Sequence, residues 1–254
     1  MDPENLPDPR DLEAFIHRCI EVFASDAPRR VPTENERSFL LLFGTCVQTI
    51  RYAEAYLALC KGDLSLEART VARAALEHAA TAEYAYFRVD GLDQFAASAE
   101  HQGWSLRERM HRWTGIAAYD PGPAPIKAPR LPSFARDSDS GLMRLLDPRT
   151  VMLDPGYSLL SQAVHVTEQT VTGFFRESDD GSGQVLLQHR RKDDLENLTI
   201  YLVAEACMLV TYIDAHLRND SLLLEELDFR SDTLLLPMRL DSDWADEDRS
   251  RAAE

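Results

Sequence analysis

Two polar stripes within otherwise apolar helical stretches carry the side chains best suited to chemistry. Each stripe has three polar residues spaced four apart: Arg69, Arg73 and Glu77 in the first, and Tyr157, Ser161 and His165 in the second. Residues four apart stack on one face of an α-helix, so each set is expected to form one stripe. If the two faces meet, an arginine or Glu77 would bond the phenol, hydroxyl or imidazole across the core.

Three interpretations of these stripes remain open. In the first, the groups form a buried hydrogen-bonded network that fixes helix register, because each unpaired buried polar group would cost ~1–3 kcal/mol. In the second, they line a pocket, with His165 as general acid or base and an arginine as anion clamp. In the third, they lie on an exposed face and have no specific role.

Two sequence segments resemble a bacterial helical domain family of unknown function. They are Ala-Arg-Thr-Val-Ala-Arg-Ala-Ala-Leu-Glu at residues 68–77 and Tyr-Ser-Leu-Leu-Ser-Gln-Ala-Val-His at residues 157–165. Members of that family pair an Arg-to-Glu helix with a Tyr-x-x-Leu-Ser-x-x-x-His helix. The resemblance covers roughly residues 33–218 and implies an all-helical fold, but it implies no reaction.

The segment Arg73-Ala-Ala-Leu-Glu-His78 is similar to the Arg-x(4–6)-His signature of HEPN-type helical ribonucleases. That resemblance implies metal-independent RNA cleavage. A histidine assists attack of the 2′-hydroxyl on the adjacent phosphate, and an arginine stabilises the developing charge. It also implies a site completed by a second copy at a dimer interface. On an ideal helix Arg73 and His78 lie about 140° apart, so Glu77 is the closer partner of Arg73.

These observations give two functional hypotheses. The first is a HEPN-like, metal-independent endoribonuclease or a defence-associated or toxin-associated protein, acting on RNA as a homodimer. Its predicted catalytic residues are Arg73, His78 and His165, and its predicted binding residues are Arg69, Glu77, Tyr157 and Ser161. The alternative is a non-enzymatic helical module that binds a protein or a small molecule.

The sequence also contains two weaker candidate sites, one for a metal ion and one for a nucleotide. His165 and Glu168 are one turn apart, and Glu54, Glu77 or Glu205 would add carboxylates as in di-iron bundles. The repeated Glu-x-x-His pair of those proteins is absent, so we predict neither a metal nor another cofactor. Residues 101–113 form the one locally basic aromatic segment, suited to meeting a phosphate and stacking a base, or to packing its tryptophans inward.

The apolar periodicity predicts an all-α bundle of six to seven helices. Asp8-Pro9 or Asp11 starts the first helix, a Thr33/Glu36 capping box starts the second before a stop at Gly62, and Ser65 caps the third. The expected helices span residues 11–24, 33–60, 65–87, 92–113, 140–146, 155–175 and about 193–217, with 221–227 as an extension or a separate turn. No strand-like alternation is longer than residues 184–188.

The domain organisation follows from composition. Residues 1–227 are expected to form one domain interrupted by a proline-rich loop at 114–137, because proline removes donors and clashes with a helical turn. Residues 228–254 are acidic and are expected to be a disordered tail.

Charge and cysteine usage narrow the function classes. Lys plus Arg total 27 and Asp plus Glu total 43, so the formal charge is −16. Such a chain repels phosphate on average, which excludes a general nucleic-acid coat but leaves room for one local basic site, and we expect no DNA partner. The N-terminus lacks a signal-like apolar region and no run reaches the ~18–20 apolar residues of a membrane span. Four separated cysteines indicate buried apolar side chains in a reducing cytoplasm.

Overall fold

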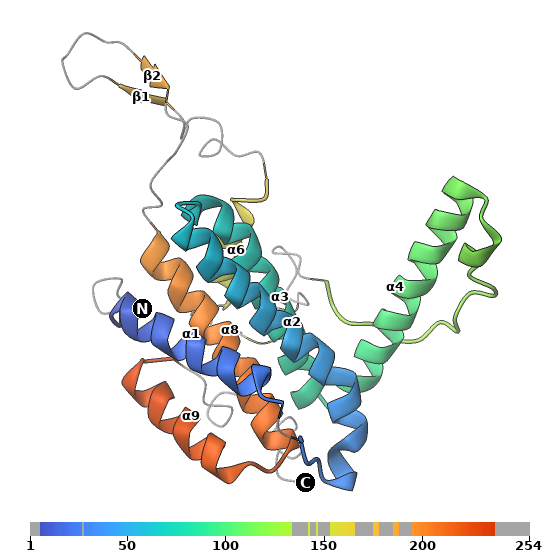
Figure 1. Ribbon diagram of the computed structural model, residues 1–254. Coiled ribbons are helices and arrows are strands. Elements are labelled where there is room, and N and C mark those ends of the chain that lie inside the picture. Colours follow the sequence, from blue (N-terminus) through green and yellow to red (C-terminus); the bar gives the residue numbers. More distant parts are fainter. Residues whose placement is uncertain are drawn as a thin grey trace.

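A computed structural model describes residues 6–26, 28–133, 142, 146, 153–165, 175–177, 185–187 and 195–236. The fold is all-α, as predicted (Figure 1). Its elements are α1 (Pro9–Ala24), η2 (Thr33–Asn35), α2 (Glu36–Lys61), α3 (Ser65–Phe87), α4 (Gly91–Thr114), η3 (Ala117–Tyr119), α6 (Leu153–Ser161), β1 (Phe175–Glu177), β2 (Val185–Leu187), α8 (Glu196–Leu217) and α9 (Ser221–Thr233).

Helix α8 is the centre of the bundle. It packs against α1, α2, α3 and α9, and nearly all of its residues from Thr199 to Leu217 are buried. A helix that is apolar on every side is stable in water only when neighbours cover every side. Within the described residues, α8 alone is long and apolar enough to cross a membrane, and 89% of its most apolar window is buried inside the fold. The cytoplasmic location stays a prediction.

Helix α3 lies between α2 and α8. Its buried face is rich in small side chains, among them Ala72, Ala75 and Ala79. Small side chains let neighbouring helix backbones approach closely, and α3 makes its most extensive contacts with α2 and α8. The alanine-rich helix is therefore central, as its composition indicates.

The helix starts differ in two places from the predicted caps. Asp8 caps α1 as expected, since its Oδ1 accepts a hydrogen bond from the Arg10 backbone nitrogen at 2.9 Å. The Thr33/Glu36 capping box is wrong, because residues 33–35 form a 3₁₀ turn and α2 begins at Glu36 without a side-chain cap. The predicted cap at Ser65 is also wrong. The tight turn through Gly62 and Asp63, which has a φ of 59°, places Leu64 at the cap position instead.

Helix α4 projects from the base of the bundle, and the proline-rich segment runs back along it (Figure 1). The helix ends at Gly115, whose φ of 68° is the left-handed conformation that glycine adopts without strain. The described part of the predicted loop contains only η3 as a regular element. Its returning end is fixed where the Leu131 backbone nitrogen donates to Ser98 Oγ at 2.8 Å.

In the second half of the chain, several helix boundaries differ from the predicted ones. The helix predicted from Pro155 to Phe175 ends at Ser161, and Phe175 instead pairs with Leu187 in the short β1–β2 ladder. After Ser161 the backbone continues only in tight i→i−3 turns, in which the nitrogens of residues 162–164 donate to the carbonyls three residues before them, so the α-helical pattern ends there. The predicted helix at 140–146 lies outside the described residues except for Leu142 and Leu146.

The C-terminal boundary of the domain lies later than predicted. Helix α9 is a separate helix that runs to Thr233, and Leu234 and Leu236 are buried after it. Their segment is held by the Tyr201 hydroxyl, which donates to the Leu235 carbonyl at 2.7 Å. The domain therefore continues past residue 227 to at least 236, and the predicted tail from 237 onward lies outside the described residues.

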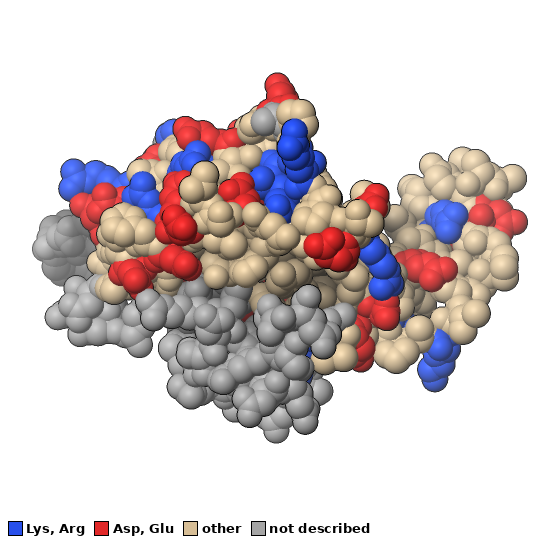
Figure 2. All heavy atoms as spheres, turned by 90° about the horizontal axis from the view of Figure 1, so that it is seen from below, with Lys and Arg blue, Asp and Glu red and all other residues tan. Residues whose placement is uncertain are grey.

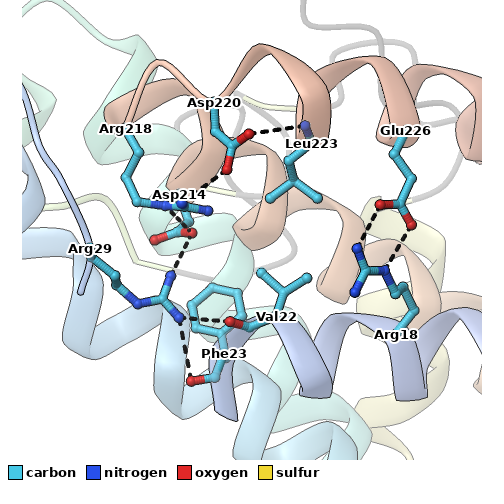
Figure 3. Close-up of polar contacts among 9 residues, drawn as sticks. All are labelled: Arg18, Val22, Phe23, Arg29, Asp214, Arg218, Asp220, Leu223 and Glu226. Atoms are coloured by element: carbon cyan, nitrogen blue, oxygen red, sulfur yellow. Dashed lines mark hydrogen bonds and ion pairs between the residues drawn. The ribbon is translucent and has the colours of Figure 1, made fainter. Parts of the chain in front are cut away.

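Ion pairs join α1 to α9 and the segment after α1 to α8 (Figure 3). Arg29 donates to Asp214 Oδ2 at 2.9 Å and to the Val22 carbonyl at 2.8 Å, while Arg218 donates to the same Asp214 oxygen at 2.9 Å. Arg18 binds both carboxylate oxygens of Glu226 at 2.7 and 2.8 Å, so α1 is tied to α9 as well. Burial raises the pKa of Asp214, and the nearby cations of Arg218 and Arg29 oppose that rise.

All four cysteines are in the thiol form, and none is joined in a disulfide. Cys19, Cys46 and Cys207 are buried, and Cys60 is partly buried. Burial raises the pKa of the Cys19 thiol to about 12 and that of Cys207 well above its ordinary value. Because the thiolate is the reactive form, these groups act as small apolar side chains rather than nucleophiles.

Candidate functional site: a cavity beside helix α3

The two predicted polar stripes meet at one pair of residues. Arg73 on α3 donates from Nη2 to the hydroxyl of Tyr157 on α6 at 2.8 Å, and its guanidinium carbon lies 5.0 Å from the centre of the Tyr157 ring. Arg73 Nε also donates to Glu77 Oε1 at 2.9 Å. The pKa of Tyr157 is raised, mainly by burial and then by the charge of Glu77. The structure thus joins Arg73, Glu77 and Tyr157.

The remaining stripe residues are arranged differently. Arg69 lies one turn before Arg73 and is only 5% exposed, so it belongs to the packed interior. Ser161 uses its hydroxyl within α6, donating to the Tyr157 carbonyl at 2.6 Å. His165 lies beyond the end of α6 and is exposed. The predicted alignment of His165 with Tyr157 and Ser161 on one helical face is therefore wrong, because the helix ends first.

His78 faces a different direction from Arg73. Its ring packs edge-on against Tyr52 of α2, with 5.2 Å between the ring centres. Its Nδ1 lies 2.9 Å from the Ala74 carbonyl oxygen, which can only accept, so Nδ1 carries a hydrogen and Nε2 is the basic nitrogen of the neutral ring. Arg73 and His78 therefore act in different places, as their angular separation on an ideal helix indicates.

A cavity of about 710 Å³ lies among α2, α3, α4 and the returning end of the proline-rich loop. Its polar lining includes Glu77, His78 and Thr81 from α3, His101 and Gln102 from α4, and Arg130 from the loop. Its apolar lining includes Phe95, Leu131, Pro132 and Leu142. Of the predicted site residues, Glu77 and His78 line this cavity.

Charge in the cavity is unevenly balanced. Glu77 is the one carboxylate among the described lining residues, and Arg73, which is not part of the lining, binds its Oε1. Arg130 therefore supplies the lining with a positive charge that Glu77, already paired, offsets only in part. With His78 and His101, the described part of the lining offers one permanent cation and two imidazoles beside apolar walls.

Sequence reasoning missed Arg130 and did not connect His101 to His78. His101 belongs to the basic aromatic segment noted in the sequence, but Arg130 carried no motif at all. Their approach to α3 depends on the turn between α3 and α4 and on the Leu131–Ser98 hydrogen bond. Neither is visible as a spacing in the sequence.

The carboxylates considered for a metal centre do not gather. Glu54 is exposed on α2, Glu77 faces the cavity, and Glu205 is buried on α8. In the part of the chain that the structure describes, no three His, Cys, Asp or Glu side chains form a cluster suited to a metal ion. Glu168 lies outside the described residues.

Comparisons with protein-family models, curated proteins and solved structures give no match. The resemblances to a bacterial helical family and to the HEPN-type ribonucleases therefore stay predictions based on the quoted residues.

Proposed function

We propose that this protein is a helical small-molecule-binding module and that the cavity beside α3 is its binding site. The supporting observation is the cavity, whose 710 Å³ falls within the roughly 300–1,000 Å³ typical of ligand pockets. Such pockets combine apolar walls with a few convergent polar groups. Here the apolar walls include Phe95 and Leu142, and the polar groups include His78 and Arg130.

The lining favours an organic anion with an apolar body. Arg130 would pair with the anionic group, and His101 would donate a further hydrogen bond, whereas the neutral His78 ring presents Nε2 as an acceptor. Glu77 does not repel such a ligand strongly because Arg73 holds its carboxylate. The apolar part of the ligand would contact Phe95 and the loop residues that close the cavity.

Binding of the aromatic sulfonate 8-anilino-1-naphthalenesulfonate to the native protein tests this proposal. We expect one site per chain by fluorescence titration, with Arg130→Ala weakening affinity about fivefold or more through loss of an ion pair. Lys127→Ala is the matched control, since Lys127 lies in the same loop but outside the lining. A Trp113→Ser variant checks for dye on the exposed end of α4. Equal affinities for the Arg130 and Lys127 variants would refute the assignment.

A second candidate function is metal-independent RNA cleavage, in which His78 acts with His101 and Arg130 instead of with Arg73. The supporting observation is that two histidines and an arginine line one cavity, whereas Arg73 is engaged by Glu77 and Tyr157. His78 Nε2 would take the proton of a ribose 2′-hydroxyl as its oxygen attacks phosphorus. His101 would protonate the departing 5′-oxygen, leaving a 2′,3′-cyclic phosphate, while Arg130 stabilises the phosphorane charge.

Electrostatics on the visible surface favours the small ligand over long RNA. Among the described residues on the bundle face seen from below, Figure 2 shows acidic and basic side chains interspersed, without a continuous basic track. Cleavage of a fluorogenic single-stranded RNA in the presence of chelator tests the second candidate. His78→Ala and His101→Ala are expected to abolish cleavage, and His17→Ala, on the outer side of α1, is the control. Wild-type protein that leaves the RNA intact excludes this function.

A further inference from the structure

The far part of α4 and the segment that follows it form an exposed arm, defined here as residues 103–129. Four basic and two acidic residues give the arm a formal charge of +2, on a chain whose total is −16. Several of its large apolar side chains are exposed, including Leu106, Ile126 and Trp113, which is 81% exposed. A cluster of exposed large apolar side chains is typical of a surface that another protein covers.

One face of α4 in the arm has a definite pattern. Leu106, Arg109 and Trp113 are spaced three and four residues apart, and all three are exposed. On a helix they lie within about 60° of one another, with roughly 10 Å between the two apolar groups. Arg109 makes no ion pair with a described residue and donates only to the Ser105 carbonyl, at 3.3 Å. The face therefore presents two apolar groups with a cation between them.

Helix α9 carries the same pattern with the opposite charge. Leu222, Glu225 and Phe229 are also spaced three and four apart and are exposed, Phe229 by 66%. The helix as a whole holds four acidic residues and one basic residue. Its two apolar groups are again roughly 10 Å apart along the helix. The apolar positions of the two helices thus match in spacing, and their central charges are complementary in either direction of packing.

The two faces belong to different ends of the molecule. Figure 1 places α4 and α9 on opposite sides of the bundle, so the faces cannot meet within one chain. We propose that the α4 face of one chain docks on the α9 face of a second copy, with Arg109 opposite Glu225 and the apolar groups in register. A contact between two different surfaces leaves the α9 face of the first copy and the α4 face of the second copy unused. The assembly is therefore head to tail, an open series or a closed ring.

Sedimentation velocity from about 1 µM to about 1 mM tests this contact over the range expected of small interfaces. We expect the average mass to rise above the 28.7 kDa monomer as concentration increases. Arg109→Glu and Glu225→Arg should each weaken association about tenfold, and the double variant should restore it to within about threefold, because the charges are exchanged. High salt should weaken the wild-type contact.

Matched controls lie on the same two helices but away from the faces. Arg107→Glu on α4 and Asp228→Arg on α9 reverse exposed charges about 90° or more from the face centres, so association should stay unchanged. Circular dichroism establishes that every variant is folded. A monomeric wild type at every concentration overturns the proposal, as does a double variant that fails to recover. A dimer that Trp113→Ser disrupts and Phe229→Ser does not would indicate an arm-to-arm contact and also overturns it.

Discussion

The buried carboxyl group of Glu205 makes the stability of the fold depend on pH in a direction the structure fixes. Glu205 is 1% exposed on α8, and its Oε2 has no hydrogen-bond partner among the described residues. Burial raises its pKa well above the ordinary value of 4.5, and the charge of Glu83 on α3 raises it further. The substitution Glu205→Gln tests this effect, because glutamine keeps the shape of the side chain but has no acidic proton to lose.

The sign follows from proton counting. Between pH 4.5 and the raised pKa, the folded protein keeps the Glu205 proton that the unfolded chain has lost. The folded state therefore binds more protons, and the free energy of unfolding falls as pH rises. One proton corresponds to about 1.4 kcal/mol per pH unit within that window. The stabilising contribution is complete below pH 4.5 and is lost as pH rises through the raised pKa.

Urea unfolding of wild type and Glu205→Gln between pH 5 and pH 8 measures this effect. We expect similar stabilities near pH 5 and a growing advantage of the variant at higher pH, with the difference approaching about 1.4 kcal/mol per pH unit. Glu54→Gln, at an exposed position of α2, is the control for a general change in net charge. Parallel pH profiles for wild type and Glu205→Gln would refute the reasoning.

Three further features of the packing are tested by substitution. Gly91→Ala should destabilise the fold by about 1–3 kcal/mol, because its new Cβ would overlap backbone atoms of α3, whereas Gly103→Ala should stabilise it by about 0.5–1 kcal/mol, because nothing lies within 4 Å. Arg29→Ala should cost about 2–3 kcal/mol, because buried Asp214 keeps only its other arginine. Tyr157→Phe should cost about 1 kcal/mol through loss of one hydrogen bond, without changing affinity for the naphthalenesulfonate dye. Urea unfolding measures all three.

Each of these substitutions has a matched comparison. The two glycine variants serve as controls for each other, since both lie on α4, and equal effects would contradict the contact argument. Arg30→Ala, beside Arg29 but exposed, should be nearly neutral. Tyr119→Phe removes a phenol from the arm for comparison with Tyr157→Phe. A neutral Arg29 variant would mean that Asp214 does not depend on it.

Local signals in the sequence predicted the helices but not all of their ends. The spacing of Leu12, Phe15 and Cys19 gave the buried face of α1, and Gly62 marked the end of α2. Both signals act over a few residues, so the sequence alone contains them. The end of α6 has no glycine or proline, and periodicity alone extended that helix to His165 and beyond.

The residues of the candidate site also fall into two groups, those that local spacing predicts and those that tertiary contacts place. Glu77 was predicted as the partner of Arg73 because four residues return the chain to one helical face. The sequence left open which of Tyr157, Ser161 and His165 would bond that face if the two helices met, and the structure shows the hydrogen bond between Arg73 and Tyr157. The presence of His78 and Arg130 in one cavity, in contrast, depends on where a long loop returns to the bundle. Tertiary contacts rather than local spacing decide that position.

Because α4 is one continuous helix, any tilt of the helix would displace both the wall of the cavity and the arm. Its first turns carry Phe95 and His101 against α3, and its last turn carries Trp113. A helix of 24 residues is about 36 Å long, so a tilt of about 10° at its base shifts the tip by about 6 Å. If the proposed ligand tilted the helix at Phe95, the tip of α4 would move several times farther than Phe95 because it lies farther from the base, and that tip belongs to the surface proposed to contact a second copy.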